Sequence, residues 1–84
     1  MRNIVLGREQ WIPTPFLEHE VKESSPKAWK FEYRDRFGRY QLKWISKAYS
    51  KLLADEDGKM RWHLRPFLFN KNDVLYFMKG KEGL

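Results

Sequence analysis

The chain contains no cysteine in its 84 residues, which excludes a disulfide framework and a thiolate metal site. No uncharged apolar run approaches the roughly 20 residues that a membrane-spanning helix needs, so we expect no membrane partner. The basic start of the chain is followed by a run of only three apolar residues, Ile4-Val5-Leu6. A secretory signal needs a longer apolar stretch, and we expect none. A cytoplasmic, intracellular location is the simplest prediction.

Chemistry-bearing residues are also scarce, because His19 and His63 are the only histidines. His19 and Glu23 could share one face of a helix, but two ligands do not make a metal site. The acidic run at residues 55–58 lacks the length and the terminal glutamate of a calcium loop. Since no nucleophile motif or glycine-rich phosphate loop is present, we predict a non-enzymatic protein with no cofactor, no metal and no small-molecule substrate.

The composition predicts one compact domain over residues 1–84, with an extended arm at 1–13 and a frayed tail at 80–84. Apolar residues make up 42% of the chain and aromatic residues 17%, which is enough for one core and argues against disorder. We find no internal repeat and no linker in the sequence.

The positive charge is concentrated in one segment. Residues 1–23 carry a net charge of −1 and residues 54–84 a net charge of +1, whereas residues 24–53 carry +6. A clustered field of one sign attracts a polyanion and accelerates the encounter with it. A solvated basic face without a partner is the alternative interpretation.

The middle of the chain supports two interpretations. Thr14-Pro15 is a helix-start signal, an N-cap residue followed by proline, and predicts a short helix. Ser24-Ser25-Pro26 is a signal of the same kind and predicts a second helix that begins at Pro26. Trp29, Tyr33, Phe37 and Tyr40 recur at helical steps, which favours a helix over residues 26–37. Phe31, Tyr33, Tyr40, Leu42 and Trp44 alternate about residues 36–39, which instead favours a β-hairpin. We favour the helix followed by a turn at Gly38.

The next segment, residues 41–54, predicts an amphipathic helix because it is rich in helix formers and has no glycine or proline. Its apolar stripe consists of Trp44, Ile45, Ala48, Tyr49 and Leu52. Its opposite face carries Lys43, Lys47 and Lys51 at steps of four, flanked by Ser46 and Ser50. Side chains at that spacing project together, and phosphates would offset their mutual repulsion.

Residues 55–58 either end the preceding helix or make a tight turn, and the alternation at 60–64 predicts a strand. The run Phe67-Leu68-Phe69 is interpreted as the second arm of a small hairpin. A last helix begins at the cap residue Asn70, packs Val74, Phe77 and Met78 inward and stops at Gly80.

Together these elements predict an α+β, winged helix-turn-helix-like domain with three to four short helices and a β-hairpin wing. The second helix of the pair would lie in a major groove of duplex DNA. The predicted recognition-helix contacts are Lys43, Ser46, Lys47, Ser50 and Lys51, and the predicted contacts from the preceding segment are Lys27, Lys30, Arg34, Arg36 and Arg39.

A second mode follows from the hairpin alternative. Basic residues alternate with aromatic ones in Trp-Lys-Phe-Glu-Tyr-Arg and in Arg-Tyr-Gln-Leu-Lys-Trp. On a hairpin those rings could stack on unpaired bases of single-stranded DNA or RNA while the arginines follow the backbone. The competing interpretation is that most of these rings belong to the core.

The C-terminal run of residues 65–78 resembles the end of phage excisionases and related MerR-like winged helix-turn-helix proteins. In those proteins an aromatic wing strand leads into a short helix that begins near an aspartate. The resemblance implies a recombination directionality factor that binds duplex DNA in the nucleoid or on viral DNA and recruits an integrase, with Lys59 and Arg61 as wing contacts. A small phage transcription regulator is the other function expected of such a duplex-DNA-binding protein. The alternative from another class is a protein-binding inhibitor or host-takeover module that docks an acidic partner surface.

Overall fold

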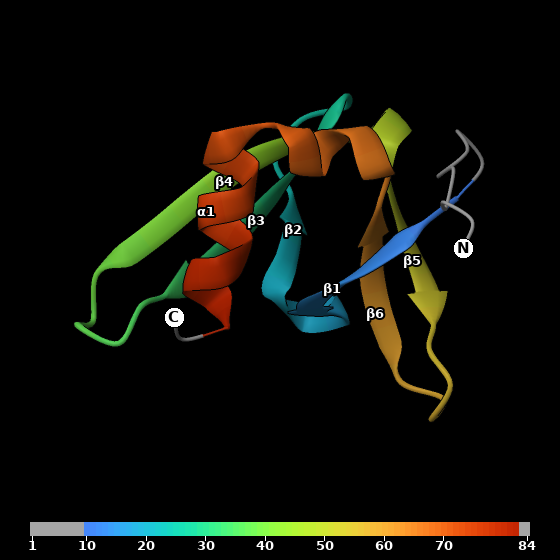
Figure 1. Cartoon of the computed structure of the whole chain (residues 1–84), viewed down its shortest axis with the longest axis horizontal. Helices are drawn as coiled ribbons and strands as arrows, with labels where there is room; N and C mark the ends of the chain where they lie inside the picture. Colours follow the sequence, from blue (N-terminus) through green and yellow to red (C-terminus); the bar gives the residue numbers. More distant parts are fainter. Residues whose placement is uncertain (1–9, 83–84) are drawn as a thin grey trace, which may run out of the picture.

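The computed structural model describes residues 10–82, which form two three-stranded antiparallel sheets and one α-helix (Figure 1). The strand order is β1-β6-β5 in the first sheet and β2-β3-β4 in the second. The strands are β1 (Ile12–Leu17), β2 (Val21–Glu23), β3 (Ala28–Arg34), β4 (Tyr40–Ser46), β5 (Ser50–Ala54) and β6 (Met60–Leu64). The helical elements are the 3-10 turns η1 (Glu18–Glu20), η2 (Lys47–Tyr49) and η3 (Pro66–Asn70) and the helix α1 (Asn72–Lys81). No helix in this described part is long and apolar enough to cross a bilayer.

Two short 3-10 turns carry the chain from one sheet to the other. The turn η1 joins β1 to β2, and η2 joins β4 to β5. At η2 the Ser46 hydroxyl accepts a hydrogen bond from the Ala48 amide at 3.2 Å, and the Ser50 hydroxyl donates to the Ser46 carbonyl at 2.8 Å. Such serine-to-backbone bonds offer the chain an alternative to continuous helix.

The connectivity of the first three strands is repeated in the last three. In each half the second and third strands form a hairpin, while the first strand pairs with the third strand of the other half. Glu23 opposite Trp29 and Leu52 opposite Trp62 therefore occupy equivalent places, and the two indole rings lie 5.0 Å apart. The sequence gives no sign of this repeat because the equivalent residues differ in type at most positions.

The core lies between the sheets, and α1 closes it. Phe16, Phe31 and Leu64 are completely buried. The Phe16 ring meets Phe31 edge-on at 5.1 Å and stacks on Phe77 of α1 at 5.6 Å. In Figure 1 α1 lies across β3 and β4. Its residues Val74, Phe77 and Met78 are buried in the core cluster.

Both long hairpins turn with the same chemistry. Residues 35–39 and 55–59 share the pattern Asp-x-x-Gly-(Arg/Lys), and each glycine has a positive φ, +80° at Gly38 and +86° at Gly58. The glycine amide donates to the aspartate carbonyl at 2.9 Å in the first turn and 3.0 Å in the second. An Asp side chain that accepts from its own turn and a glycine with positive φ favour a tight hairpin turn.

Replacing Gly38 by alanine is expected to lower the free energy of unfolding by about 1–2 kcal/mol, the cost of left-handed backbone for an L-residue. The added Cβ meets no atom within 4 Å, so the loss has only a backbone origin. Gly38→Asn is the matched control and should lose less, because asparagine adopts this conformation more readily. Urea unfolding measures both, and equal losses would contradict the turn geometry.

The predicted winged helix-turn-helix fold is wrong. The helix expected after Thr14 is replaced by the end of β1 and by η1. The helix expected over residues 26–37 is replaced by β3, and the one expected over residues 41–54 by β4, η2 and β5. In the β3–β4 hairpin, burial follows the period of two of a strand, since Phe31 and Ile45 are buried while Trp44 is exposed. Aromatic residues fit a pleated surface, and cross-strand packing outweighs the modest helix preference of lysine, leucine and alanine.

The C-terminal third was predicted better. Of the two alternatives for 55–58 the tight turn is the correct one, and the strand at 60–64 and a last helix with Val74, Phe77 and Met78 inward are confirmed. The helix begins at Asn72 and includes Gly80 and Lys81. The second hairpin arm expected at 67–69 is wrong, because η3 begins at Pro66. Proline suits the first turn of a helix and has no N–H to donate to a strand partner. Most of the expected N-terminal arm, residues 1–9, lies outside the described residues, as does the end of the expected tail.

Candidate nucleic-acid interface

The three lysines expected on one helix face lie on three different elements. Lys43 is on β4 and its ammonium contacts the Asp73 carboxylate of α1. Lys47 is on η2, 3.0 Å from a Glu23 carboxylate oxygen and 4.4 Å from the Trp29 ring centre. Lys51 is on β5, with its ammonium 5.8 Å from the ring of Trp11. The predicted lysine face is therefore wrong, because the helix that would carry it is absent.

The other predicted contacts divide between two hairpins. Ser46 and Ser50 bond the local backbone, and Ser50 is buried. Lys59 and Arg61 lie on the β5–β6 hairpin, where Arg61 Nε donates to Asp55 at 2.8 Å. The β3–β4 hairpin and the residue just before it hold the rest: Lys27, Lys30, Arg34, Arg36 and Arg39. In Figure 1 the tips of the two hairpins point in different directions.

One face of the second sheet carries basic and apolar rows side by side. The strand register places Tyr40, Leu42 and Trp44 of β4 directly opposite residues of β3. Their partners, in the same order, are Arg34, Glu32 and Lys30, and Lys22 of β2 lies beyond Lys30. We call these seven residues the outer face. The core residues Phe31 and Ile45 occupy the alternate positions and point to the other side.

The apolar row is open to solvent. Tyr40 is 49% exposed, Leu42 39% and Trp44 53%. Alternate residues of an antiparallel strand lie about 6.8 Å apart, because each residue rises about 3.4 Å. A contiguous exposed apolar group rimmed by charges marks an interaction site more often than a scattered exposed residue does.

Glu32 connects the two rows. Its carboxylate lies 3.1 Å from the Lys22 ammonium and accepts a hydrogen bond from the Tyr40 hydroxyl. These two partners lower the pKa of Glu32, and the same hydrogen bond raises the pKa of Tyr40. The Arg34 guanidinium stands 5.7 Å from the centre of the Tyr40 ring. The contacts with Glu32 and Arg34 therefore hold the Tyr40 side chain in place, although about half of the residue stays exposed to solvent.

The hairpin tip extends the basic surface. Phe37 is 68% exposed, and the guanidinium groups of Arg36 and Arg39 lie 5.1 and 5.2 Å from its ring centre. The Asp35 carboxylate accepts from the amides of Phe37 and Arg39, both at 2.9 Å. The Arg39 amide is the main cause of the lowered pKa of Asp35. A fixed backbone thus presents two arginines and an exposed ring at the end of the outer face.

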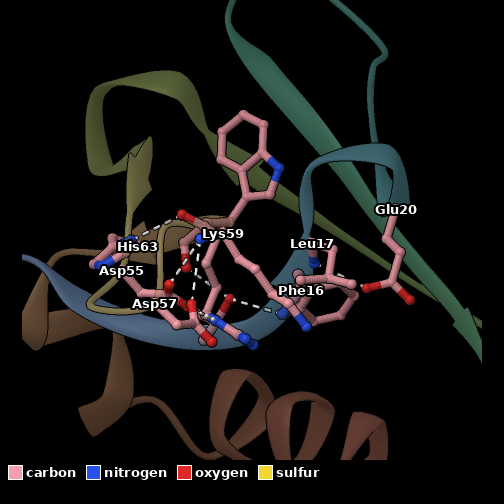
Figure 2. A network of polar contacts seen from close by, with 10 residues as sticks. Phe16, Leu17, Glu20, Asp55, Asp57, Lys59 and His63 are labelled. Atoms are coloured by element: carbon pink, nitrogen blue, oxygen red, sulfur yellow. Dashed lines mark hydrogen bonds and ion pairs between the residues drawn. The ribbon is translucent and has the colours of Figure 1, made fainter.

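The turn of the β5–β6 hairpin is held in the same way, by an aspartate carboxylate that accepts hydrogen bonds from a backbone amide of the turn. Figure 2 shows Asp55 and Asp57 beside Lys59 at this turn, and the Lys59 amide donates to Asp55 at 3.0 Å and to Asp57 at 3.2 Å. A side-chain hydrogen bond shared with Asp57 and one donated by Arg61 Nε lower the pKa of Asp55 to about 2. The Asp55 carboxylate therefore holds its own hairpin turn together and is no part of the outer face.

The depressed pKa of Asp55 predicts a dependence of stability on acid. The ionised carboxylate stabilises the fold fully when the pH is above the pKa of Asp55 in the unfolded chain, which is near 4. This contribution is lost as the pH falls toward the folded-state pKa of about 2. Unfolding by urea at pH 7, 4 and 2.5 measures it, and Asp55→Asn should show a smaller drop between pH 4 and 2.5 than the wild type. Identical drops would contradict the role of this carboxylate.

The exposed row was present in the sequence only as part of the hairpin alternative. The decisive signal was the repeated Asp-x-x-Gly-(Arg/Lys) pattern at 35–39 and 55–59. The second copy was interpreted as a turn, and the first copy has the same chemistry. No protein-family model, curated protein or solved structure matches this chain.

Proposed function

We propose that this protein binds single-stranded nucleic acid on the outer face, without catalysing a reaction. The observation that carries the proposal is the register of the β3–β4 hairpin, which sets Tyr40, Leu42 and Trp44 beside Lys30 and Arg34. Base stacking on aromatic side chains combined with a basic path for the backbone is the common physical basis of single-strand binding.

The spacing of the row favours a single strand over a duplex. Tyr40 and Trp44 are about half exposed, and only unpaired, splayed bases can offer their faces to such rings. Alternate strand residues are about 6.8 Å apart, about twice the 3.4 Å step per nucleotide of a stacked duplex strand. An extended, unstacked strand therefore matches the row better than paired bases do.

The charges are arranged to take up the phosphates. Within residues 10–82, Lys30 and Arg34 take part in no ion pair. Arg34 Nη1 donates to the Gly38 carbonyl at 3.0 Å, and the other N–H groups of its guanidinium are left for a phosphate, as is the Lys30 ammonium. Arg36 and Arg39 continue the same field around the tip, and the segment 24–53 keeps its net charge of +6. Such a field brings a polyanion to the face and lets the rings select unpaired bases.

Titration of a labelled single strand and of the matching duplex, each at several salt concentrations, tests the proposal. We expect the single strand to bind more tightly at every salt concentration. Tighter binding of the duplex would instead favour insertion of the basic hairpin into a groove, and absence of binding to both at low salt would refute a nucleic-acid ligand.

The salt dependence identifies the residues that contact phosphates. For a single strand, log K falls by about 0.7 per log unit of salt for each phosphate contacted. The double variant Lys30→Gln, Arg34→Gln should therefore reduce the slope by about 1.4 if each side chain meets one phosphate. Lys51→Gln, on the other sheet, is the control and should leave the slope unchanged; a reduced slope for this control alone would move the site to β5.

A further inference from the structure

A groove begins where the apolar row of the outer face ends. It has a volume of about 480 Å³ and separates β4 and η2 from η3 and α1. Trp44 belongs both to the outer face and to the wall of the groove. We name it the β4 groove, and its lining residues that matter here are Trp44, Tyr49, Phe67, Lys71 and Asp73.

The walls of the β4 groove are aromatic and exposed. Tyr49 and Phe67 meet edge-on, with ring centres 4.8 Å apart and planes at 89°. Tyr49 is 42% exposed and Phe67 44%, although the next residue, Leu68, is buried in the core. The core therefore takes Leu68 from η3 and leaves the Phe67 ring to the groove. Apolar walls with few polar groups are typical of small-ligand sites, and this volume falls within the usual range of about 300–1,000 Å³.

The acidic group in the lining of the β4 groove is the carboxylate of Asp73, beside the polar residues Lys43, Ser46 and Lys71. Asp73 is bound to the Lys43 ammonium and to the Val74 amide at 2.8 Å, and 63% of its side chain is exposed. Lys43 also lowers the pKa of Asp73, so the group accepts hydrogen bonds and donates none. A base that turns an amino group toward it gains a hydrogen bond, whereas a base that turns a carbonyl oxygen toward it is repelled.

We infer that the β4 groove holds one unstacked base of the strand bound on the outer face, with the base stacked against Phe67 and its exocyclic amine donating a hydrogen bond to Asp73. The inference rests on the proposed function, because the strand reaches the groove over Trp44. Among the pyrimidines it selects cytosine, whose N4 amine donates, over thymine and uracil, which present the O4 acceptor at the same place. Lys71 also lines the groove, so its ammonium can contact the phosphate next to this base.

Fluorescence anisotropy with oligo(dC) and oligo(dT) of equal length tests this inference on the full chain. The wild type should bind oligo(dC) about fivefold more tightly or better, the discrimination that one net hydrogen bond provides. Asp73→Asn should abolish this preference, because an amide can both donate and accept. Phe67→Ala should weaken both oligonucleotides about fivefold or more, as the loss of one stacking partner does.

Met60→Ala serves as the control for an exposed apolar residue, since Met60 is 39% exposed and lies on β6. Circular dichroism and urea unfolding establish that each variant is folded, and Phe67→Leu replaces Phe67→Ala if the latter is not. A groove that serves a protein partner, or nothing, leaves both affinities unchanged in these variants and overturns the inference. The proposed function then still stands if single strands bind, whereas a wild type that binds neither oligonucleotide refutes both.

Discussion

Replacing Tyr40 and Trp44 together with alanine is expected to weaken the binding of a single-stranded oligonucleotide by about 30-fold or more. Each ring that loses a stacked base costs about 1–3 kcal/mol, and two such losses at the low end give about 30-fold at room temperature. Both side chains are half exposed, so the fold should lose little. Fluorescence anisotropy at one low salt concentration measures the effect.

Two further variants separate stacking from a general disturbance of the sheet. The double variant Tyr40→Phe, Trp44→Phe keeps both rings and should retain most of the affinity, although it removes the Tyr40 hydroxyl from Glu32. Met60→Ala removes an exposed apolar side chain from the other sheet and should bind as the wild type does. Equal losses in all three variants would show that the rings of the outer face are not the contact.

Replacing Phe31 by alanine is expected to lower the free energy of unfolding by about 3–5 kcal/mol, the usual cost of removing a buried phenylalanine. Its side chain is completely buried and its ring lies 5.1 Å from Phe16 and 5.6 Å from Trp62, so it joins the two sheets. Urea unfolding measures the loss, and a variant that no longer folds gives the same answer in the circular dichroism spectrum.

Phe37→Ala is the matched comparison on the same hairpin. Phe37 is 68% exposed at the tip, and a surface change of this kind usually alters stability by less than about 0.5 kcal/mol. The helix hypothesis for residues 26–37 makes Phe37 part of the inward stripe with Trp29 and Tyr33, and it therefore predicts a large loss. A loss at Phe37 comparable with that at Phe31 would contradict the hairpin.

The sequence allowed the end of the chain to be predicted because local and tertiary preferences agree there. In α1 the spacing of Val74, Phe77 and Met78 matches the helix period, and all three are buried. At 55–64 an Asp-Gly turn precedes a clean alternation of apolar and polar residues. Where turn chemistry and periodicity indicate the same element, a prediction from residues alone is sound.

The failure over residues 41–54 has a different cause. Lysine, leucine and alanine there have good helix propensity, but the differences amount to less than about 1 kcal/mol per residue. Pairing of β4 with β3 and of β5 with β6 buries Ile45 and Ser50 against long-range partners that a local window does not contain. The apparent lysine face followed from that window, and its members meet Asp73, Glu23 and Trp11 instead.

The candidate site could be predicted only as an alternative. The alternation of Tyr40, Leu42 and Trp44 was visible, as was the basic content of the segment. What the residues did not specify was which rings face inward, because aromatic residues occupy both faces of the hairpin. The register with β3 settles this, since it buries Phe31 and leaves Trp44 in solvent.

Mapping of backbone amide chemical shifts during titration with a single-stranded oligonucleotide tests the central claim most directly. The account predicts that the largest changes fall on residues 30–44, at Tyr40, Leu42 and Trp44 and across the strand at Lys30 and Arg34. It also predicts that a matching duplex gives weaker changes at equal concentration. Changes confined to the β5–β6 hairpin, or a stronger response to the duplex on any surface, would contradict it.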